Sequence, residues 1–189
     1  MKTTVTIVDE TQDMAQKCVK DQYPGGVTRE EAYWRAMIMD HFLNQTPAPS
    51  EARASFETVH NIARQLSTHP TNLSWDAKDP LGLSKLKLNR EQKEEYVSLR
   101  SNSIMESLTR IWIPYTFVVL DSGYMGWAPH GVEAGDVFCL FEGCISPFVL
   151  RPTPIADTFS LWGDGYVQGF MPGQRPGVEG RPKEWLKLI

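Results

Sequence analysis

The residues best able to carry out chemistry lie in the last third of the chain, where aromatic side chains are interspersed with polar ones. Aromatic groups with a few polar neighbours are typical of small-molecule pockets, and a small β core needs the same groups for packing. If a proton is transferred there, the acid or base is expected among Asp164, Tyr166, His130 and Tyr124. The side chains expected to hold a ligand are Trp127, Arg151, Trp162 and Gln168. The sequence leaves open whether this cluster lines a pocket or fills a core.

Three of the polar positions also have a purely structural interpretation. His130 lies between a proline and a glycine, which predicts a loop, and loop histidines commonly face solvent. Arg151 ends an apolar segment, where a lone cation either pairs with an acid or marks an anion site. Asp136 follows a glycine just before another apolar segment, where the glycine supplies a turn and the carboxylate bonds to nearby backbone amides. We favour the structural interpretation at these positions.

The sequence predicts neither a metal site nor a cofactor. Cys139 and Cys144 are separated by four residues, but nothing nearby completes a four-ligand zinc site, so we expect core or hairpin cysteines. The chain has no phosphate-binding loop, no dinucleotide-binding glycine motif after a strand and no nucleophile elbow. Any enzymatic activity is therefore expected to be cofactor-independent.

Composition excludes several classes of partner. A net charge of −4, spread over both halves of the 189 residues, does not provide the basic surface of a nucleic-acid-binding protein. The longest apolar run, residues 111–120, is interrupted by Pro114 and is too short to span a membrane. Three cysteines without close pairing and an acidic start without an apolar segment favour a reducing compartment. We therefore expect a cytoplasmic protein that binds neither nucleic acid nor membrane.

Residues 1–110 of the expected single domain, 1–189, are predicted to be mainly helical. Thr28 and Glu31 have the spacing of a capping box, which predicts a helix from there to about residue 42. The clearest amphipathic pattern follows in residues 50–67, where the apolar residues Ala52, Phe56 and Val59 are spaced four and three positions apart. Two further helices are predicted over residues 10–20 and 89–110, with a loop over 68–89.

Residues 111–189 are predicted to be mainly β, because short apolar segments alternate there with turn residues. The predicted strands cover 117–120, 124–128, 137–141, 148–151, 158–162, 166–170 and 185–189, and a loop is expected over 172–182. The fold class is therefore α+β. We expect the helical half to pack on a small antiparallel β-barrel or curled sheet.

Several of these segments carry a family resemblance. They read DSGYMGWAP at 121–129, GDV at 135–137, PFVLR at 147–151 and EEAYWR at 30–35, and residues 163–171 complete the set. In order and separation they resemble the C-terminal region of fungal heterokaryon-incompatibility proteins. The resemblance extends from about residue 22 to residue 171.

The resemblance implies a fungal source, an intracellular setting and a role related to non-self recognition. Full-length members begin with a separate death-inducing domain similar to TIR domains, which this sequence is expected to lack, so the cell-killing activity is not carried over. The family commonly has GLGP where this chain has GWAP at 126–129, histidine in place of Gln168, and DGE in place of PGQ at 172–174. Such changes indicate either retuning for a ligand or the loss of a constraint.

Two hypotheses from different classes follow. The first is a non-catalytic module that recognises a small molecule or a protein partner through its β half. It predicts an exposed apolar patch near Trp127 or Trp162 and no buried ionisable group with a strongly shifted pKa. The second is a tailoring enzyme, a cyclase or isomerase acting on a fungal secondary metabolite in a closed aromatic pocket. We favour the first hypothesis because it needs no chemistry that the sequence fails to show.

Overall fold

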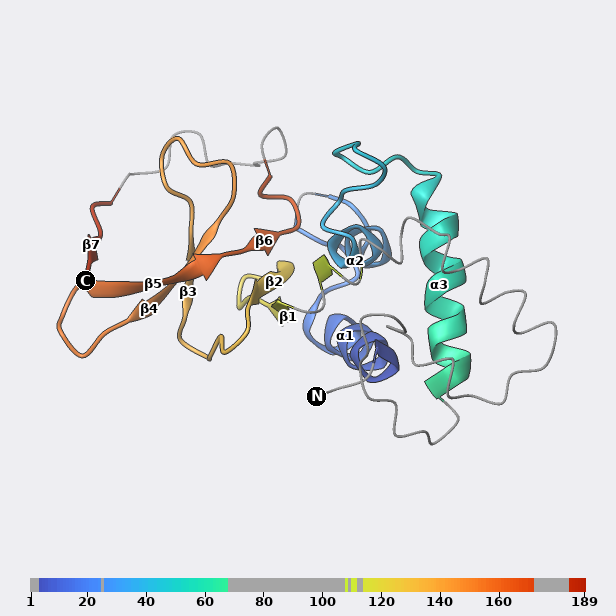
Figure 1. Ribbon diagram of the computed structural model, residues 1–189, viewed down its shortest axis with the longest axis horizontal. Helices are drawn as coiled ribbons and strands as arrows, with labels where there is room; N and C mark the ends of the chain where they lie inside the picture. Colours follow the sequence, from blue (N-terminus) through green and yellow to red (C-terminus); the bar gives the residue numbers. More distant parts are fainter. Residues whose placement is uncertain (1–3, 25, 68–107, 109, 112–113, 172–183) are drawn as a thin grey trace.

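A computed structural model describes residues 4–24, 26–67, 108, 110–111, 114–171 and 184–189. The helices in these ranges are α1 (Thr4–Cys18), α2 (Arg29–Met37) and α3 (Ala52–Ser67). They gather at one end of the molecule, and the strands occupy the other (Figure 1). The α+β prediction, with helices first in the chain, is confirmed. The predicted loops over 68–89 and 172–182 and most of the predicted helix over 89–110 lie outside the described residues.

Helix α2 begins where the capping signal predicts. The Thr28 hydroxyl accepts a hydrogen bond from the backbone N–H of Glu31 at 3.1 Å. The helix ends five residues earlier than predicted. Met39 and Asp40 adopt φ values of +51° and +50°, which a right-handed helix cannot accommodate. The chain therefore turns sharply at Asp40, and this turn contributes to the polar network described below.

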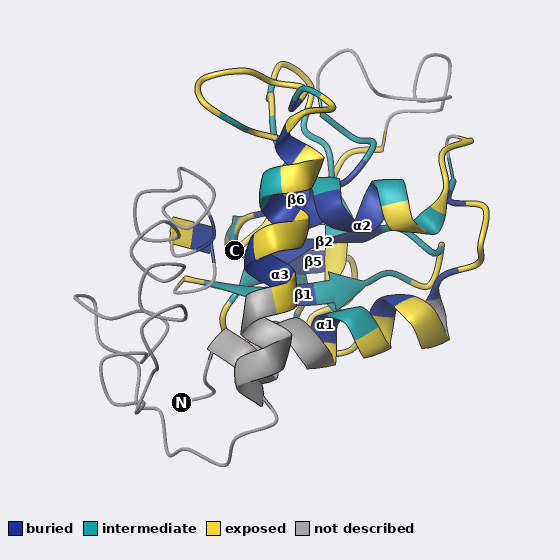
Figure 2. Cartoon of the chain, turned by 90° about the vertical axis from the view of Figure 1, so that its right-hand side faces the viewer, coloured by how far each residue is buried: buried dark blue, intermediate teal, exposed yellow. Residues whose placement is uncertain are grey.

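Helix α1 packs mainly against α3 and less extensively against α2. Helix α1 starts six residues before the predicted helix, at Thr4. Helix α3 starts at Ala52 and buries the first part of its predicted apolar stripe, Ala52, Phe56 and Val59. Buried residues cover the inner sides of the helices and the strands behind them (Figure 2).

The strands lie close to their predicted positions. They are β1 (Tyr115–Val119), β2 (Met125–Pro129), β3 (Val137–Cys139), β4 (Phe148–Pro152), β5 (Thr158–Asp164), β6 (Tyr166–Val167) and β7 (Lys187–Leu188). They form a three-stranded sheet with the order β1-β2-β6 and a four-stranded sheet with the order β3-β4-β5-β7. The smaller sheet lies next to the helices, and the larger one lies farther out (Figure 1).

Two details of the predicted β half need correction. The described strands form two separate hydrogen-bonded sheets and no closed barrel. In addition, β7 pairs with β5 in parallel, whereas an antiparallel arrangement was expected throughout. A parallel pair needs a connection of about a dozen residues or more, and residues 165–186 provide it.

Two glycines allow β6 to join the smaller sheet directly after β5, one at the passage between the sheets and one on the neighbouring strand β2. Gly165 alone separates β5 from β6, and a Cβ atom there would lie 2.8 Å from the Phe138 ring. On β2, a Cβ atom at Gly126 would lie 2.1 Å from the backbone oxygen of Tyr166. Any side chain at Gly126 would therefore push β2 and β6 apart.

The main apolar core lies between the helices and the smaller sheet. Its buried members come from α1, α2, α3, β1, β2 and β6. Trp127 is among the largest of them and is almost fully enclosed. In the described part of the chain, no helix has the length and apolar character needed to cross a membrane.

Candidate functional site

Three of the predicted site residues lie in the interior. The Trp127 indole N–H donates a hydrogen bond of 2.7 Å to the backbone oxygen of Ala36, near the C-terminal end of α2. The last carbonyl groups of a helix lack partners within the helix, so this bond satisfies one of them. The Tyr166 hydroxyl donates a hydrogen bond to the side-chain oxygen of Gln168, and both residues are buried. These side chains connect the helices to the smaller sheet.

Tyr23, a residue that the sequence did not single out, completes this interior group. Its hydroxyl donates to the backbone oxygen of Gln168 and accepts from the backbone N–H of Met125, both at 2.9 Å. Burial raises the pKa of Tyr23 well above its ordinary value. Burial also raises the pKa of Tyr166, and the charge of Asp40 adds to this effect. The expectation that no buried ionisable group has a strongly shifted pKa is therefore wrong, although both shifts favour the neutral phenol.

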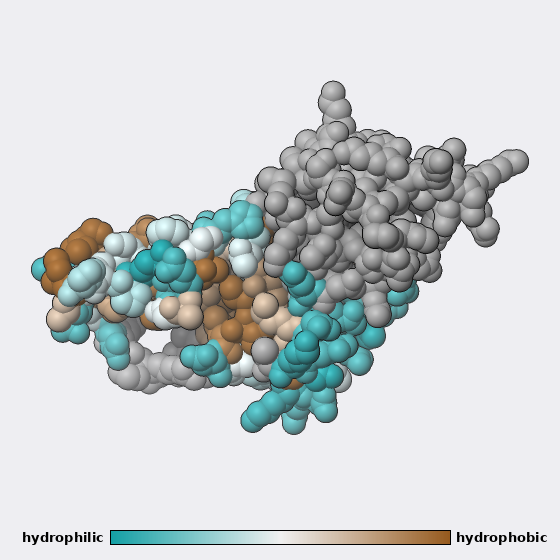
Figure 3. Space-filling view, turned by 90° about the horizontal axis from the view of Figure 1, so that it is seen from below, coloured by the Kyte–Doolittle hydropathy of each residue, from teal (hydrophilic) through white to brown (hydrophobic). Residues whose placement is uncertain are grey.

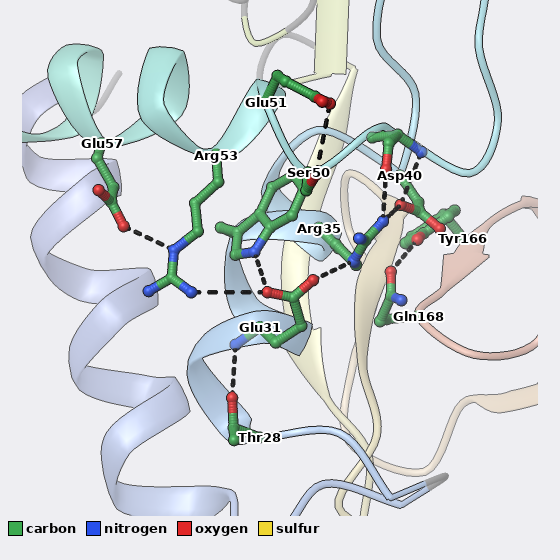
Figure 4. Close-up of polar contacts among 12 residues, drawn as sticks. Thr28, Glu31, Arg35, Asp40, Ser50, Glu51, Arg53, Glu57, Tyr166 and Gln168 are labelled. Carbon is green, nitrogen blue, oxygen red and sulfur yellow. Dashed lines mark hydrogen bonds and ion pairs between the residues drawn. The ribbon is translucent and has the colours of Figure 1, made fainter.

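A charged network lies beside this group (Figure 4). Asp40 is fully buried, and its Oδ1 accepts hydrogen bonds from Arg35 Nη1 at 2.6 Å and from the backbone N–H of Ala48 at 3.1 Å. Arg35 also donates to Glu31 Oε1 at 2.6 Å. Arg53 on α3 approaches the other Glu31 oxygen at 3.7 Å. The network therefore fixes the turn after α2 and joins α2 to α3.

The position of Glu31 within this network shifts its titration. Partial burial alone would raise the pKa of Glu31. The hydrogen bonds from the Trp34 indole and from Arg35, together with the charges of Arg35 and Arg53, outweigh burial and lower the pKa below its ordinary value. The spacing of Glu31 and Arg35, four residues apart on a helix, is a sequence signal for this ion pair. No comparable signal identifies Asp40.

Four other predicted site residues lie together on the outside of the molecule. The Arg151 guanidinium stacks on the Trp162 ring, with its central carbon 3.9 Å from the ring centroid. The same guanidinium donates to both carboxylate oxygens of Asp136, at 2.8 and 2.7 Å, and to the backbone oxygen of Gly131 at 2.7 Å. Hydrogen bonds from Arg151 lower the pKa of Asp136, against partial burial, which raises it. The predicted pairing of Arg151 with an acid is confirmed.

His130 and Asp164 lie next to this pair. The Trp162 indole donates to the backbone oxygen of His130 at 3.3 Å, and the His130 ring is 2.8 Å from the Thr116 hydroxyl. The Tyr115 hydroxyl donates to Asp164 at 3.1 Å. Partial burial and the charge of Asp164 raise the pKa of Tyr115. We call this outer group, composed of Tyr115, His130, Arg151, Trp162 and Asp164, the Trp162 surface.

Comparisons with known proteins place this chain in a family. The model of the Het-6 beta-barrel domain matches residues 12–186, which is most of the chain. The chain belongs to the Het-6 beta-barrel domain family. A stretch of 56 residues is 36% identical to heterokaryon incompatibility protein 6, OR allele, of Neurospora crassa. That stretch covers 29% of this chain and only 8% of the Neurospora protein. No solved structure gives a significant match.

In this Het-6 domain, the candidate acids and bases are distributed over different environments. Tyr166 is buried, whereas His130 and Asp164 are exposed. Tyr124 is half-buried, and its ring contacts those of Tyr23 and Phe170, with centroids 5.6 and 4.7 Å away. The enzyme hypothesis requires all four groups to converge in one pocket. Tyr166 and Tyr124 instead belong to the core or pack against it, whereas His130 and Asp164 lie on the Trp162 surface.

Metal binding has no support from the described residues of this Het-6 domain. Within them, no group of three or more histidine, cysteine, aspartate or glutamate side chains is placed to hold a metal ion. Cys139 and Cys144 are half-buried thiols in and beside β3, outside any disulfide. Burial raises the pKa of Cys139, as does its neighbour Cys144. A raised pKa makes Cys139 a weaker nucleophile near neutral pH.

Proposed function

We propose that this Het-6 domain is a recognition module of heterokaryon-incompatibility type, which binds a protein partner through the Trp162 surface inside a fungal cell. Membership of the family and the similarity to the Neurospora protein support a role related to heterokaryon incompatibility. The assignment of recognition to a particular surface rests on a single observation. Trp162 is exposed, yet it is held in place by the stacked Arg151.

The geometry of Arg151 makes this surface suitable for binding. Tryptophan, tyrosine and arginine are the residues that most often dominate the energy of protein interfaces. Here Arg151 is fixed by Asp136 and by Gly131, so the Trp162 ring rests on a side chain that is already ordered. A partner that covers Trp162 would therefore lose little side-chain entropy on binding.

The types of residue present favour a protein partner over a small molecule. Trp162 and Arg151 offer an aromatic ring and a cation, while Asp164 and the Tyr115 hydroxyl add polar groups at the margin. An aromatic centre with a polar rim is the usual composition of a protein interface. The first hypothesis predicted an exposed apolar patch near Trp127 or Trp162; Trp162 is exposed, whereas Trp127 is buried.

The proposal can be tested by comparing partners of the wild-type chain with those of Trp162→Ala. Leu43→Ala is a matched control, because Leu43 is an exposed apolar residue in the connection between α2 and α3. Tagged proteins are expressed in the fungus, cross-linked and purified, and co-purifying proteins are quantified by mass spectrometry. We expect a partner recovered with the wild-type and Leu43→Ala chains to fall at least about tenfold with Trp162→Ala.

A genetic readout connects binding to function. Strains that carry Trp162→Ala are paired with strains that are incompatible with the wild-type parent, and heterokaryon formation is scored. We expect the substitution to change the outcome of these pairings, with Leu43→Ala behaving as the parent. Unchanged partners together with unchanged pairings would refute the proposal.

A further inference from the structure

Trp162 interrupts the regular pairing of its strand. Where β5 pairs with β4, Val149 lies opposite Gly163, and the next residue of β4 already lies opposite Leu161. Trp162 is therefore an extra residue in β5, which is the definition of a β-bulge. Bulges often redirect a side chain next to a functional site. The side chain redirected here is the exposed tryptophan of the Trp162 surface.

The neighbours of the Trp162 ring hold it on one face and along one edge. The Arg151 guanidinium covers one face, with its central carbon 3.9 Å from the ring centroid. A Cβ atom at Gly131 would lie 3.2 Å from the ring, on the side that carries the indole N–H, so the backbone passes close to that edge. Trp162 nevertheless remains 40% exposed. The part that Arg151 and Gly131 leave uncovered is therefore an aromatic surface held in a fixed position.

The charged groups around this ring are mostly acidic. Asp136 accepts two hydrogen bonds from Arg151 and so offsets that cation. A second carboxylate oxygen, Glu133 Oε1, lies 3.6 Å from Arg151 Nη1, and Asp164 follows Trp162 by two residues on β5. Three carboxylates and one guanidinium give these described residues a net charge of −2. The surroundings of the ring therefore favour a cation.

Two of these carboxylates are accessible to a partner. The Glu133 side chain is 71% exposed, and its 3.6 Å contact with Arg151 is too long for a hydrogen bond. Asp164 is exposed and accepts a hydrogen bond from Tyr115, whereas a carboxylate has room for about four. Figure 3 shows hydrophilic residues beside apolar ones over the strand end of the molecule. A cation that approaches the ring can therefore reach a carboxylate as well.

We propose that the partner of the Trp162 surface presents a basic segment, in which an arginine stacks on the exposed part of Trp162 and adjacent basic side chains pair with Glu133 and Asp164. This inference rests on the proposed function and specifies the chemistry of the partner. A guanidinium can stack on an aromatic ring and pair with a carboxylate at the same time. Arg151 does both within this chain, since it stacks on Trp162 and bonds to Asp136. Nucleic acids and anionic membranes are disfavoured, because the carboxylates repel phosphate.

Fluorescence anisotropy with the purified full chain tests this inference. The probe is a labelled peptide of alternating glycine and arginine. Its control is the same peptide with citrulline, which keeps the shape of arginine but has no charge. At about pH 8, where an ordinary histidine is neutral, we expect binding that weakens as salt is added, because salt screens exposed charges. The citrulline peptide should bind at least about tenfold more weakly.

Variants connect this binding to the proposed residues, after circular dichroism has shown that each one folds. Trp162→Ala should raise the dissociation constant at least about tenfold. One exposed ion pair contributes up to about fivefold to binding, so the double variant Glu133→Gln/Asp164→Asn should raise it about tenfold. Asp13→Asn/Glu57→Gln is the matched control, because it removes the same charge from exposed carboxylates on α1 and α3. We expect this control to bind like the wild type.

Three results would overturn the inference. They are an arginine peptide that does not bind, a citrulline peptide that binds equally well, and a Glu133→Gln/Asp164→Asn chain that binds as tightly as the control. None of them refutes the proposed function, which fails instead if Trp162→Ala leaves both partners and pairings unchanged in the fungus. A partner that depends on Trp162, together with no binding of the arginine peptide, would show that recognition uses chemistry other than a basic segment.

Discussion

The buried carboxylate of Asp40 allows a quantitative test of how the turn after α2 is held. Asp40→Asn keeps an acceptor for the Ala48 N–H and tolerates the left-handed φ of +50°, but it removes the negative charge opposite Arg35. A hydrogen bond to a charged group is worth about 1.5–3 kcal/mol. Arg35 keeps Glu31 and retains some solvent exposure, so we expect a loss of about 2 kcal/mol in the free energy of unfolding.

The companion variant Asp40→Ala should cost more, because two further effects are added. The Ala48 N–H loses its acceptor, which costs roughly 1–3 kcal/mol in a buried position. Alanine in the left-handed region costs roughly a further 1–2 kcal/mol. We therefore expect a total loss of about 4–7 kcal/mol for Asp40→Ala. The difference between the two variants isolates the contribution of the acceptor and the turn from that of the charge.

Urea unfolding followed by tryptophan fluorescence measures both losses, and thermal unfolding checks them. A loss of about 2 kcal/mol corresponds to roughly 4–8 °C in Tm for a chain of this size. Asp13→Asn is the control, because Asp13 forms an exposed ion pair with Lys17 that is worth less than about 1 kcal/mol. If Asp40→Asn were no more destabilising than Asp13→Asn, or if Asp40→Ala matched Asp40→Asn, the assignment of Asp40 as the anchor of the turn would be wrong.

Three further predictions concern the interior. Trp127→Phe removes the indole hydrogen bond to Ala36 and leaves part of the core volume empty, so it should lower the free energy of unfolding by about 2 kcal/mol. An unchanged midpoint in urea unfolding would contradict this prediction. Because folding lowers the pKa of Glu31, the Glu31 carboxylate stabilises the protein above its ordinary pKa of about 4.5, and this contribution is lost as pH falls below that value. Glu31→Gln should therefore flatten the decline of Tm between pH 5 and pH 3. Because folding raises the pKa values of Tyr23 and Tyr166, their neutral hydroxyls stabilise the protein, and this contribution is lost as pH rises above about 10. In an alkaline titration followed by absorbance at 295 nm, these two tyrosines should ionise only when the protein unfolds. Ionisation of all six tyrosines before unfolding would refute this assignment.

Local signals predicted the elements, whereas contacts distant in sequence decided how they are arranged. The start of α2 depends on Thr28 and Glu31, three residues apart, so the sequence shows it directly. Turn residues likewise located the strands to within a few residues. The end of α2 depends instead on Asp40 and its bond to Ala48, which no periodic pattern indicates. Sheet membership depends on the change of sheet at Gly165, and for this reason the barrel was predicted and two sheets are found.

The candidate site shows the same division. Arg151 and Asp136 were each expected to have a structural partner, and the structure pairs them with each other. Residue type also identified Trp162 as a possible binding residue, but exposure separates it from Trp127, which lies in the core. Exposure depends on which elements cover a strand, and this information is absent from the spacing of aromatic residues along it. Tyr23 was missed because its partners lie more than 100 residues away.

Trp127 and Gln168, the positions where we expect this chain to depart from the family pattern, both make contacts within the chain. The larger ring at Trp127 supplies an N–H that reaches the end of α2, which leucine at this position could not do. The amide of Gln168 accepts the hydroxyl proton of Tyr166, so the uncharged side chain still satisfies a buried donor. Neither contact requires a ligand, because the Trp127 N–H and the Gln168 side-chain oxygen each have a partner in the protein. The variation that matters for recognition should therefore be sought on the exposed Trp162 surface, where a substitution changes what a partner meets without disturbing these buried bonds.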